Sequence, residues 1–261
     1  MESTSRSLPG GIYAAVITFF DSDTENIDLK TQNQHIARLV KAGIAGFVIM
    51  GSNGEALHLS IEERSTIIRE TRSCLDVLGK TQTPVIAGCS DQSVRDTVHL
   101  CREAALTGSD YAIVLSPSYF RGGMSLDVIE RFFAAVVEYF PGVSAGIEMD
   151  SGLLSRVSQH LNVAGTRFTC GDTGKLSRAA TAMKSRQPYA IFGGLADFIL
   201  PALIAGATGS TRTKAALNVL FGYGGKPRQP LEALPQVSVL AMQRGLEKLV
   251  TLERLTVRPA L

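Results

Sequence analysis

The sequence is almost neutral, and the features that it lacks exclude several kinds of protein. Its 26 basic and 24 acidic residues leave a formal net charge of +2, so we expect neither nucleic acid nor an anionic membrane as its main partner. No apolar run is long enough to span a bilayer. Hydrophobic residues make up 45% of the 261 positions, which favours a globular chain with one large domain over residues 1–261.

Metal-binding and secretory patterns are missing as well. The four cysteines form no C-x-x-C pair and the four histidines are dispersed, so we expect no metal site and no metal cofactor. Reduced thiols in an intracellular protein are the simplest interpretation. The first residues, MESTSRSLPGG, contain no apolar segment typical of a secretory signal. Their serines and Arg6 leave a mitochondrial location open beside a cytoplasmic one.

Short apolar segments alternate with segments of helical periodicity along most of the chain. This alternation predicts an α/β fold with a parallel sheet and helical crossovers. It does not distinguish a closed barrel from an open sheet, although no G-x-G-x-x-G follows the first strand, which weakens a dinucleotide-binding interpretation. The predicted strands are residues 12–18, 47–50, 84–87, 111–115, 163–169 and 189–192. The predicted helices are residues 29–41, 61–78, 93–106, 125–140, 151–160 and 196–204.

The alternation breaks in two places. No convincing strand separates the helices predicted at 125–140 and 151–160, and none follows the helix predicted at 196–204. The pattern therefore predicts six strands, whereas a closed (β/α)8 barrel needs eight.

The segment 46–55, GFVIMGSNGE, is the most informative of the sequence. Its apolar part is typical of a strand buried on both faces. The glycines after it would let backbone amides approach a ligand, and the Ser52 and Asn53 side chains suit a small carboxylate. Ser60 and Glu63 then form a capping box that predicts a helix start. An ordinary βα turn would explain a lone G-x-x-G equally well.

As a longer string, GSNGEALHLSIEER resembles the second strand and following loop of the dihydrodipicolinate synthase/N-acetylneuraminate lyase family. FGGLADFILPALIAGA and TKAALNVLFGYGGKPRQPL also resemble this family, in particular its fungal 4-hydroxy-2-oxoglutarate and deoxy-hexulosonate aldolase members. The resemblance implies a (β/α)8 TIM barrel with C-terminal helices and a site on the C-terminal loops. It also implies that segments are missing around strand five and strand eight, and that Gly51, Ser52 and Asn53 bind the carboxylate of a 2-keto acid.

The family's Schiff-base lysine is replaced in this sequence. VAGTRFTCGD, residues 163–172, matches the family motif with Arg167 at the lysine position. A guanidinium is always protonated and cannot act as this nucleophile. Arg167 could instead bind an anionic ligand or pair with Glu55 or Asp172. Lys175 and Lys214 are the obvious substitutes for the lysine, but we expect both to be solvated structural residues.

The resemblance assigns Tyr119, in the string SPSY, to a dimer contact and to a proton relay that enters the neighbouring site. Ser52 would be a further relay member. A packed loop aromatic is the alternative for Tyr119. The family's second tyrosine motif is not recognisable, and Tyr139 continues the period of the helix predicted at 125–140. Gly193 and Gly194 would leave room for substrate, or would simply form a tight βα turn.

These residues lead to a lyase-family protein. In the family, a 2-keto acid of the pyruvate type and an aldehyde undergo aldol cleavage or condensation through a Schiff base, without a cofactor, in a homo-oligomer such as a dimer or tetramer. Because of Arg167, a catalytically inactive barrel that binds keto acids or a homologous subunit is the alternative. A phosphate-binding barrel of another chemistry is a weaker third hypothesis, which rests on the Gly-rich loops alone.

Overall fold

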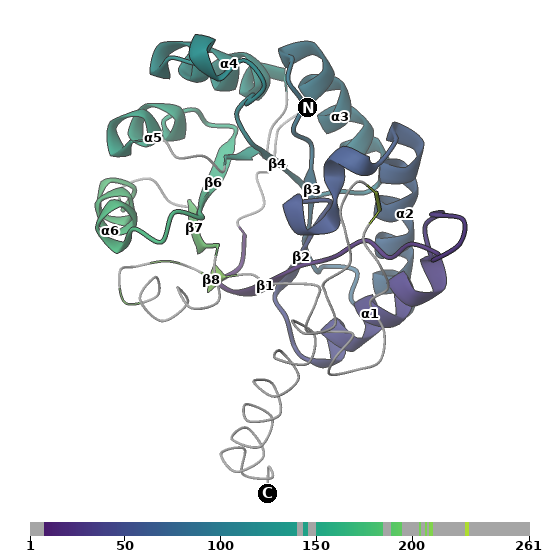
Figure 1. Cartoon of the computed structure of the whole chain (residues 1–261). Coiled ribbons are helices and arrows are strands. Elements are labelled where there is room, and N and C mark those ends of the chain that lie inside the picture. Colours follow the sequence, from purple (N-terminus) through teal and green to yellow (C-terminus); the bar gives the residue numbers. More distant parts are fainter. Residues whose placement is uncertain are drawn as a thin grey trace, which may run out of the picture.

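Eight parallel strands close into a barrel, with helices around the outside (Figure 1). The structure is a computed structural model that describes residues 8–139, 143–145, 150–184, 189–194, 204, 207, 209–210 and 228–229. Each strand pairs with its neighbours in chain order, and β8 pairs with β1 to close the sheet. The strands are β1 Gly11–Ala15, β2 Gly46–Ile49, β3 Val85–Gly88, β4 Tyr111–Val114, β5 Val143–Ala145, β6 Val163–Phe168, β7 Ala190–Gly193 and β8 Gly209–Ser210.

The predicted helices within the described residues are confirmed, and most begin at a polar capping residue. At the start of α2, Ser60 accepts a hydrogen bond from the Glu63 amide at 3.2 Å, and the Glu63 carboxylate accepts one from the Ser60 amide at 2.8 Å. This is the predicted capping box. The helices are α1 Leu29–Lys41, α2 Ile61–Val77, α3 Val94–Thr107, α4 Leu126–Tyr139, α5 Ser151–Ser158 and α6 Thr173–Ala182. Short 3-10 turns follow β2 (η1 Ser52–Gly54 and η2 Ala56–His58) and β4 (η3 Arg121–Gly123).

Alternate residues of the strands supply two separate apolar cores. Phe47 and Ile49 of β2 pack in a cluster that includes helix residues such as Phe133. Val48, which lies between them, belongs to a second cluster with Tyr13 and other strand residues but no helix residues. Because successive side chains of a strand point to opposite faces, the second cluster fills the barrel and the first packs the helices against it.

The prediction of only six strands is wrong. The chain forms strands in both places where the alternation breaks, and these two are the shortest of the barrel: β5 has three residues and β8 has two. Their sequences, Val-Ser-Ala and Gly-Ser, are too short and too polar to give the apolar run that marks a buried strand. Short pairings suffice here because neighbours on both sides supply the hydrogen bonds.

Some sequence predictions fall outside the described residues. These are the C-terminal helices and nearly all of the helix predicted at 196–204. Within the described part of the chain, no helix is both long and apolar enough to cross a bilayer.

Candidate functional site

A cavity of about 310 Å³ opens at the carboxyl ends of the strands. Most of its lining comes from β1 to β4 and the loops that follow them, with Ser52 and Asn53 from the loop after β2. On the opposite side, Arg167 is the one lining residue that β6 contributes. The carboxyl ends of the strands are where barrel proteins of this architecture place their sites, and the volume lies at the small end of the range for ligand pockets.

The segment that follows β2, residues 50–59 and hereafter the β2 loop, has an unusual backbone. Met50 and Glu55 adopt positive φ angles of 52° and 54°, a conformation that costs a residue with a side chain about 1–2 kcal/mol. Between them, η1 carries Ser52 and Asn53 into the cavity lining. Sequence reasoning missed both strained positions, because neither residue is a glycine or an asparagine.

Close packing beneath the β2 loop keeps this backbone in place. The Thr18 hydroxyl donates to the Gly54 carbonyl oxygen at 2.7 Å. A Cβ on Gly54 would lie 2.9 Å from the Val16 carbonyl oxygen, and one on Gly88 would collide with the Met50 carbonyl. These two glycines therefore allow the loop to approach β1 and β3 closely.

The Arg64 side chain of α2 also holds the β2 loop, by hydrogen bonds to backbone carbonyl oxygens. Its guanidinium donates to the carbonyl oxygens of Ala56 at 2.5 Å and Gly88 at 3.0 Å. The side chain is buried, and this burial lowers the pKa of Arg64. Its positive charge is thus used inside the protein to bind carbonyl oxygens, which would otherwise be costly to bury unpaired.

Glu55 and His58 form a polar pair at the edge of the cavity. The His58 Nδ1 lies 3.3 Å from the Glu55 Oε2, and the Glu55 side chain is only 4% exposed. The same oxygen accepts a hydrogen bond from the Arg228 amide at 2.8 Å. A buried carboxylate next to the cavity is thus stabilised by one partner from the same loop, His58, and by one that lies 173 positions away, Arg228.

Arg167 belongs to β6 and lines the cavity. Its Nη2 donates to the Gly194 carbonyl oxygen at 3.1 Å. Burial lowers the pKa of Arg167, and the guanidinium is a hydrogen-bond donor without acceptor capacity. Asp172, one of the pairing partners considered for Arg167, accepts a hydrogen bond from the Lys175 amide at the start of α6.

Gly194 lies against Arg167, whereas Gly193 belongs to the barrel wall. A Cβ on Gly194 would lie 2.7 Å from the Phe168 carbonyl oxygen and 3.3 Å from the Arg167 guanidinium carbon. Gly194 thus leaves space for the arginine. Gly193 is the last residue of β7, paired with Phe168 and Ser210. Neither glycine is among the residues that line the cavity.

Tyr119 lies at the rim and not in the cavity wall. The residue is 78% exposed, and its ring packs edge-to-face with that of Phe120 at a centroid distance of 4.9 Å. Its neighbour Ser118 lines the cavity, but Tyr119 does not. Ser52 and Tyr119 therefore do not share the cavity wall, and the relay implied by the resemblance stays a prediction. Tyr139 is helical, as predicted. Lys175 does not line the cavity, and Lys214 lies outside the described residues.

Two lining residues that the sequence analysis did not single out follow β3. The Ser90 hydroxyl accepts a hydrogen bond from the Leu115 amide at 2.7 Å. The Gln92 Oε1 accepts hydrogen bonds from the Ser118 and Tyr119 amides, both at 2.9 Å. Both side chains thus brace the loop after β4. Their position directly after a buried strand, like that of Ser52 and Asn53, was the signal that could have found them.

Comparison with known proteins decides the family. The sequence matches the Dihydrodipicolinate synthetase family over residues 8–220. The chain belongs to this family. It is 37% identical to an L-threo-3-deoxy-hexylosonate aldolase from Hypocrea jecorina, across 95% of this chain and 98% of the relative. It is 33% identical to an Emericella nidulans protein named as a mitochondrial 4-hydroxy-2-oxoglutarate aldolase, across 96% of this chain and 98% of that one. These fungal relatives are named aldolases, which are lyases, as the sequence motifs predicted.

Solved structures of the family confirm the barrel. A dihydrodipicolinate synthase family protein from Coccidioides immitis superposes with a TM-score of 0.83 at 24% identity, over 95% of this chain and 98% of that one. The Thermotoga maritima dihydrodipicolinate synthase superposes with a TM-score of 0.85 at 17% identity, over 92% and 98% of the two chains.

The alignment with the Hypocrea relative also shows that this chain is shortened. It runs over 309 positions, whereas the chain has 261 residues. The difference, 309 minus 261, means that at least 48 positions of the relative have no counterpart here. The expectation that segments are missing is thereby supported, and their location around strands five and eight stays a prediction.

Proposed function

We propose that this family member binds a 2-keto acid of the pyruvate type in the cavity and does not form a Schiff base at residue 167. The observation that carries the proposal is the placement of Arg167 in the cavity wall opposite Ser52 and Asn53. An arginine has no free amine lone pair with which to attack a carbonyl carbon, but it is well suited to bind a carboxylate or a polarised carbonyl oxygen.

Different residues bind different groups of the keto acid. In this proposal Gly51, Ser52 and Asn53 bind the carboxylate, with the serine hydroxyl and the amide nitrogen as donors. The Arg167 guanidinium contacts the keto oxygen or the second carboxylate oxygen. Hydrogen bonds to a charged group contribute about 1.5–3 kcal/mol each, so two or three of them suffice for a specific complex with a small anion.

A second candidate is an active aldolase, favoured by the names of the fungal relatives. Aldol cleavage through a Schiff base needs a lysine amine and then proton transfers. Residues 141–149, PGVSAGIEM, contain no tyrosine that could follow β5, so both the nucleophile and one relay member would have to come from elsewhere in the chain. This candidate therefore requires more unobserved components than simple binding does.

Assembly and location extend the proposal. The exposed Tyr119 and Phe120 side chains at the rim suit a contact with a second copy of this chain, in a dimer or tetramer. We also propose a cytoplasmic location, with the mitochondrion as the alternative because the Emericella nidulans relative is named for that organelle.

Calorimetric titration with pyruvate tests the proposed function. Propionate, which has the carboxylate without the keto oxygen, is the control ligand, and Arg167→Met is the matched variant. We expect saturable pyruvate binding by the unaltered chain, at least about tenfold weaker binding by Arg167→Met, and little binding of propionate. Absence of pyruvate binding, or equal binding by the two proteins, would overturn the proposal.

A further inference from the structure

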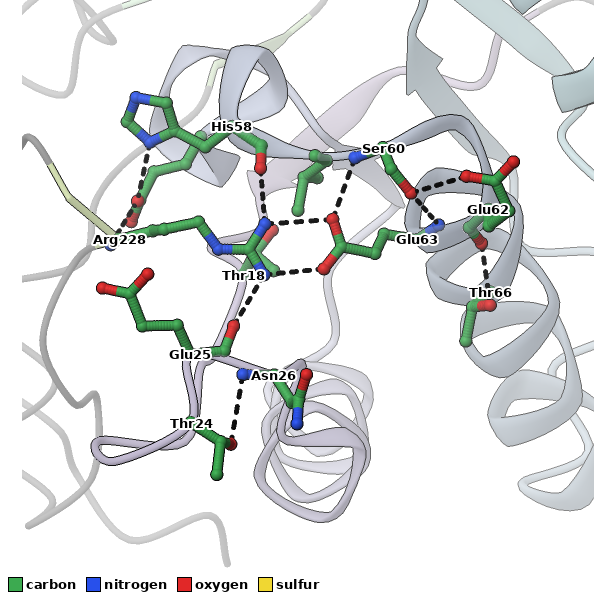
Figure 2. Close-up of polar contacts among 12 residues, drawn as sticks. Thr18, Thr24, Glu25, Asn26, His58, Ser60, Glu62, Glu63, Thr66 and Arg228 are labelled. Atoms are coloured by element: carbon green, nitrogen blue, oxygen red, sulfur yellow. Dashed lines mark hydrogen bonds and ion pairs between the residues drawn. The ribbon is translucent and has the colours of Figure 1, made fainter.

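Arg228 reaches into the β2 loop from far along the chain. Its Nη1 donates to the His58 carbonyl oxygen at 2.5 Å and to the Glu63 Oε2 at 3.0 Å. Its Nη2 donates to the Glu63 Oε1 and to the Glu25 carbonyl oxygen, both at 2.6 Å. Figure 2 shows the guanidinium between the Glu63 carboxylate and the carbonyl groups of His58 and Glu25.

These contacts join three separate segments at the mouth of the barrel. The Glu25 carbonyl and the Phe20 ring, whose centroid lies 4.3 Å from the guanidinium carbon, belong to the connection between β1 and α1. Glu55 and His58 belong to the β2 loop, and Glu63 lies in the first turn of α2. One residue that follows β8 in the chain thus joins the connection after β1 to the C-terminal half of the β2 loop, the segment that carries Ser52 and Asn53.

The β2 loop has a physical need for such a support. Its strained residues Met50 and Glu55 keep their positive φ angles only where tertiary contacts over-determine the backbone. The Glu55 carboxylate is almost fully buried and accepts a hydrogen bond from the Arg228 backbone amide, which the guanidinium contacts of the same residue hold in place. Loss of the guanidinium would also leave the carboxylate of Glu63, at the start of α2, without its bidentate partner.

We propose that Arg228 is a positioning residue for the β2 loop, so that the affinity of the cavity for a 2-keto acid depends on the segment that follows the barrel. The proposal rests on the proposed function for its ligand. It assigns Arg228 no contact with the ligand. Its role is to set the geometry of Ser52 and Asn53 through the residues that follow them, which are Glu55 and His58 of the β2 loop and Glu63 at the start of α2.

Arg72 is a matched control at the opposite end of the barrel. It is 18% exposed against 15% for Arg228. Its guanidinium donates to Asp110 at 2.5 Å and to the carbonyl oxygens of Thr83 at 3.0 Å and Gly108 at 3.1 Å. Thr83 and Asp110 precede β3 and β4, on the side away from the cavity. Removal of Arg72 should therefore destabilise the fold to a similar degree without touching the β2 loop.

The test compares Arg228→Ala, Arg228→Lys and Arg72→Ala in the full chain. Calorimetry gives pyruvate affinity, and hydrogen exchange followed by mass spectrometry gives the opening of residues 51–59. We expect Arg228→Ala to weaken pyruvate binding about tenfold or more and to speed exchange in 51–59 by a similar factor. Arg228→Lys should remain impaired, because one ammonium cannot replace the planar fork. Arg72→Ala should lower the melting temperature and leave both readouts unchanged.

The readouts separate this proposal from the proposed function. If the unaltered chain binds no pyruvate, the proposed function fails, and exchange in residues 51–59 still decides the role of Arg228. Faster exchange there in Arg228→Ala alone supports positioning. Unchanged exchange, equal effects of Arg228→Ala and Arg72→Ala on the loop, or full recovery by Arg228→Lys would overturn it.

Discussion

The two sides of the cavity differ in how they are built. The first side is formed by β2, β3 and β4 and is hereafter called the β2–β4 side. Its Ser52 and Asn53 line the cavity, and Arg64 holds its loops by hydrogen bonds to backbone carbonyl oxygens. The side formed by β5 and β6, hereafter the β5–β6 side, contributes Arg167 from β6 to the lining and begins with a three-residue strand. In the proposed function the first side binds the acid group, and the second has Arg167 at the position where the resemblance implies the family's lysine.

This difference separates recognition from chemistry. A keto acid is held by its carboxylate, but it reacts at its carbonyl carbon, so the two tasks need different groups. In the proposed function, the arginine on the β5–β6 side abolishes the covalent step, while Gly51, Ser52 and Asn53 on the β2–β4 side keep their contacts with the carboxylate. The four predictions below test this separation, beginning with the largest effect.

The first prediction concerns the covalent step and is all-or-none. Incubation of the chain with pyruvate and borohydride should give no reduced adduct, because Arg167 cannot form an imine. Arg167→Lys, treated in the same way, should be trapped at position 167, because a buried lysine loses part of its protonation. Intact mass and peptide mapping measure both. An adduct on Lys175, Lys214 or any other lysine of the unaltered chain would contradict the prediction.

The second prediction concerns turnover by Arg167→Lys. Trapping need not lead to catalysis, since residues 141–149 supply no tyrosine for proton transfer. We expect aldol cleavage by this variant to stay at least about a hundredfold slower than cleavage by the Hypocrea relative on that relative's substrate. Steady-state kinetics of the two proteins side by side make the measurement. Comparable rates would show that the β5–β6 side is complete after all.

The third prediction concerns the stability of the fold at acidic pH and rests on His35 of α1, the helix that leads into β2. Burial, with a smaller contribution from Arg38, lowers the pKa of His35 from 6.5 to about 4. The unfolded chain therefore binds a proton more readily between these values, so the contribution of neutral His35 is present above about pH 6.5 and is lost as the pH falls toward 4. The total loss should be on the order of 3 kcal/mol.

Denaturant unfolding of the unaltered chain and of His35→Leu across this pH range measures that contribution. The variant should lose most of the slope between pH 6.5 and 4, whatever its absolute stability. His99→Gln, at an exposed position of α3, is the control and should keep the slope. An unchanged slope in His35→Leu would assign the acid sensitivity to other groups.

The fourth and smallest effect concerns the carboxylate site itself. Ser52→Ala should weaken pyruvate binding by about 1.5–3 kcal/mol, because it removes one hydrogen bond to a charged group. Ser22→Ala, a change at an exposed serine outside the cavity lining, should leave the affinity unchanged. Calorimetry compares the two, and equal affinity of Ser52→Ala and the unaltered chain would place the ligand elsewhere.

Local patterns predicted the elements of this fold well. The helix expected at 29–41 has those bounds in the structure, and the capping box at Ser60 is present. Such features depend on neighbours three or four residues apart, which periodicity detects. The strands β5 and β8 were missed because pairing with existing neighbours, and not their own composition, makes them strands.

The site was predicted in part, for a similar reason. Ser52, Asn53 and Arg167 were found because each lies at the end of a strand or in a recognisable string. The support from Arg228 was not found, since it joins residues about 170 positions apart in the sequence. Tyr119 was predicted as a functional residue, but it is exposed and is not among the residues that line the cavity, so its role stays a prediction.

The closure of the barrel at β8 has a consequence for how the chain is made. Gly11 of β1 pairs with Gly209, and Glu55 accepts a hydrogen bond from Arg228, so both partners are synthesised long after the residues that they contact. At a synthesis rate of about 5–20 residues per second, roughly 10–40 s separate the emergence of β1 from that of its partner. During this interval the nascent sheet has an open edge at β1, which is the kind of edge that pairs with other chains. The ribosome-bound chain is therefore where assistance by a chaperone would matter most, before two residues of β8 complete the ring.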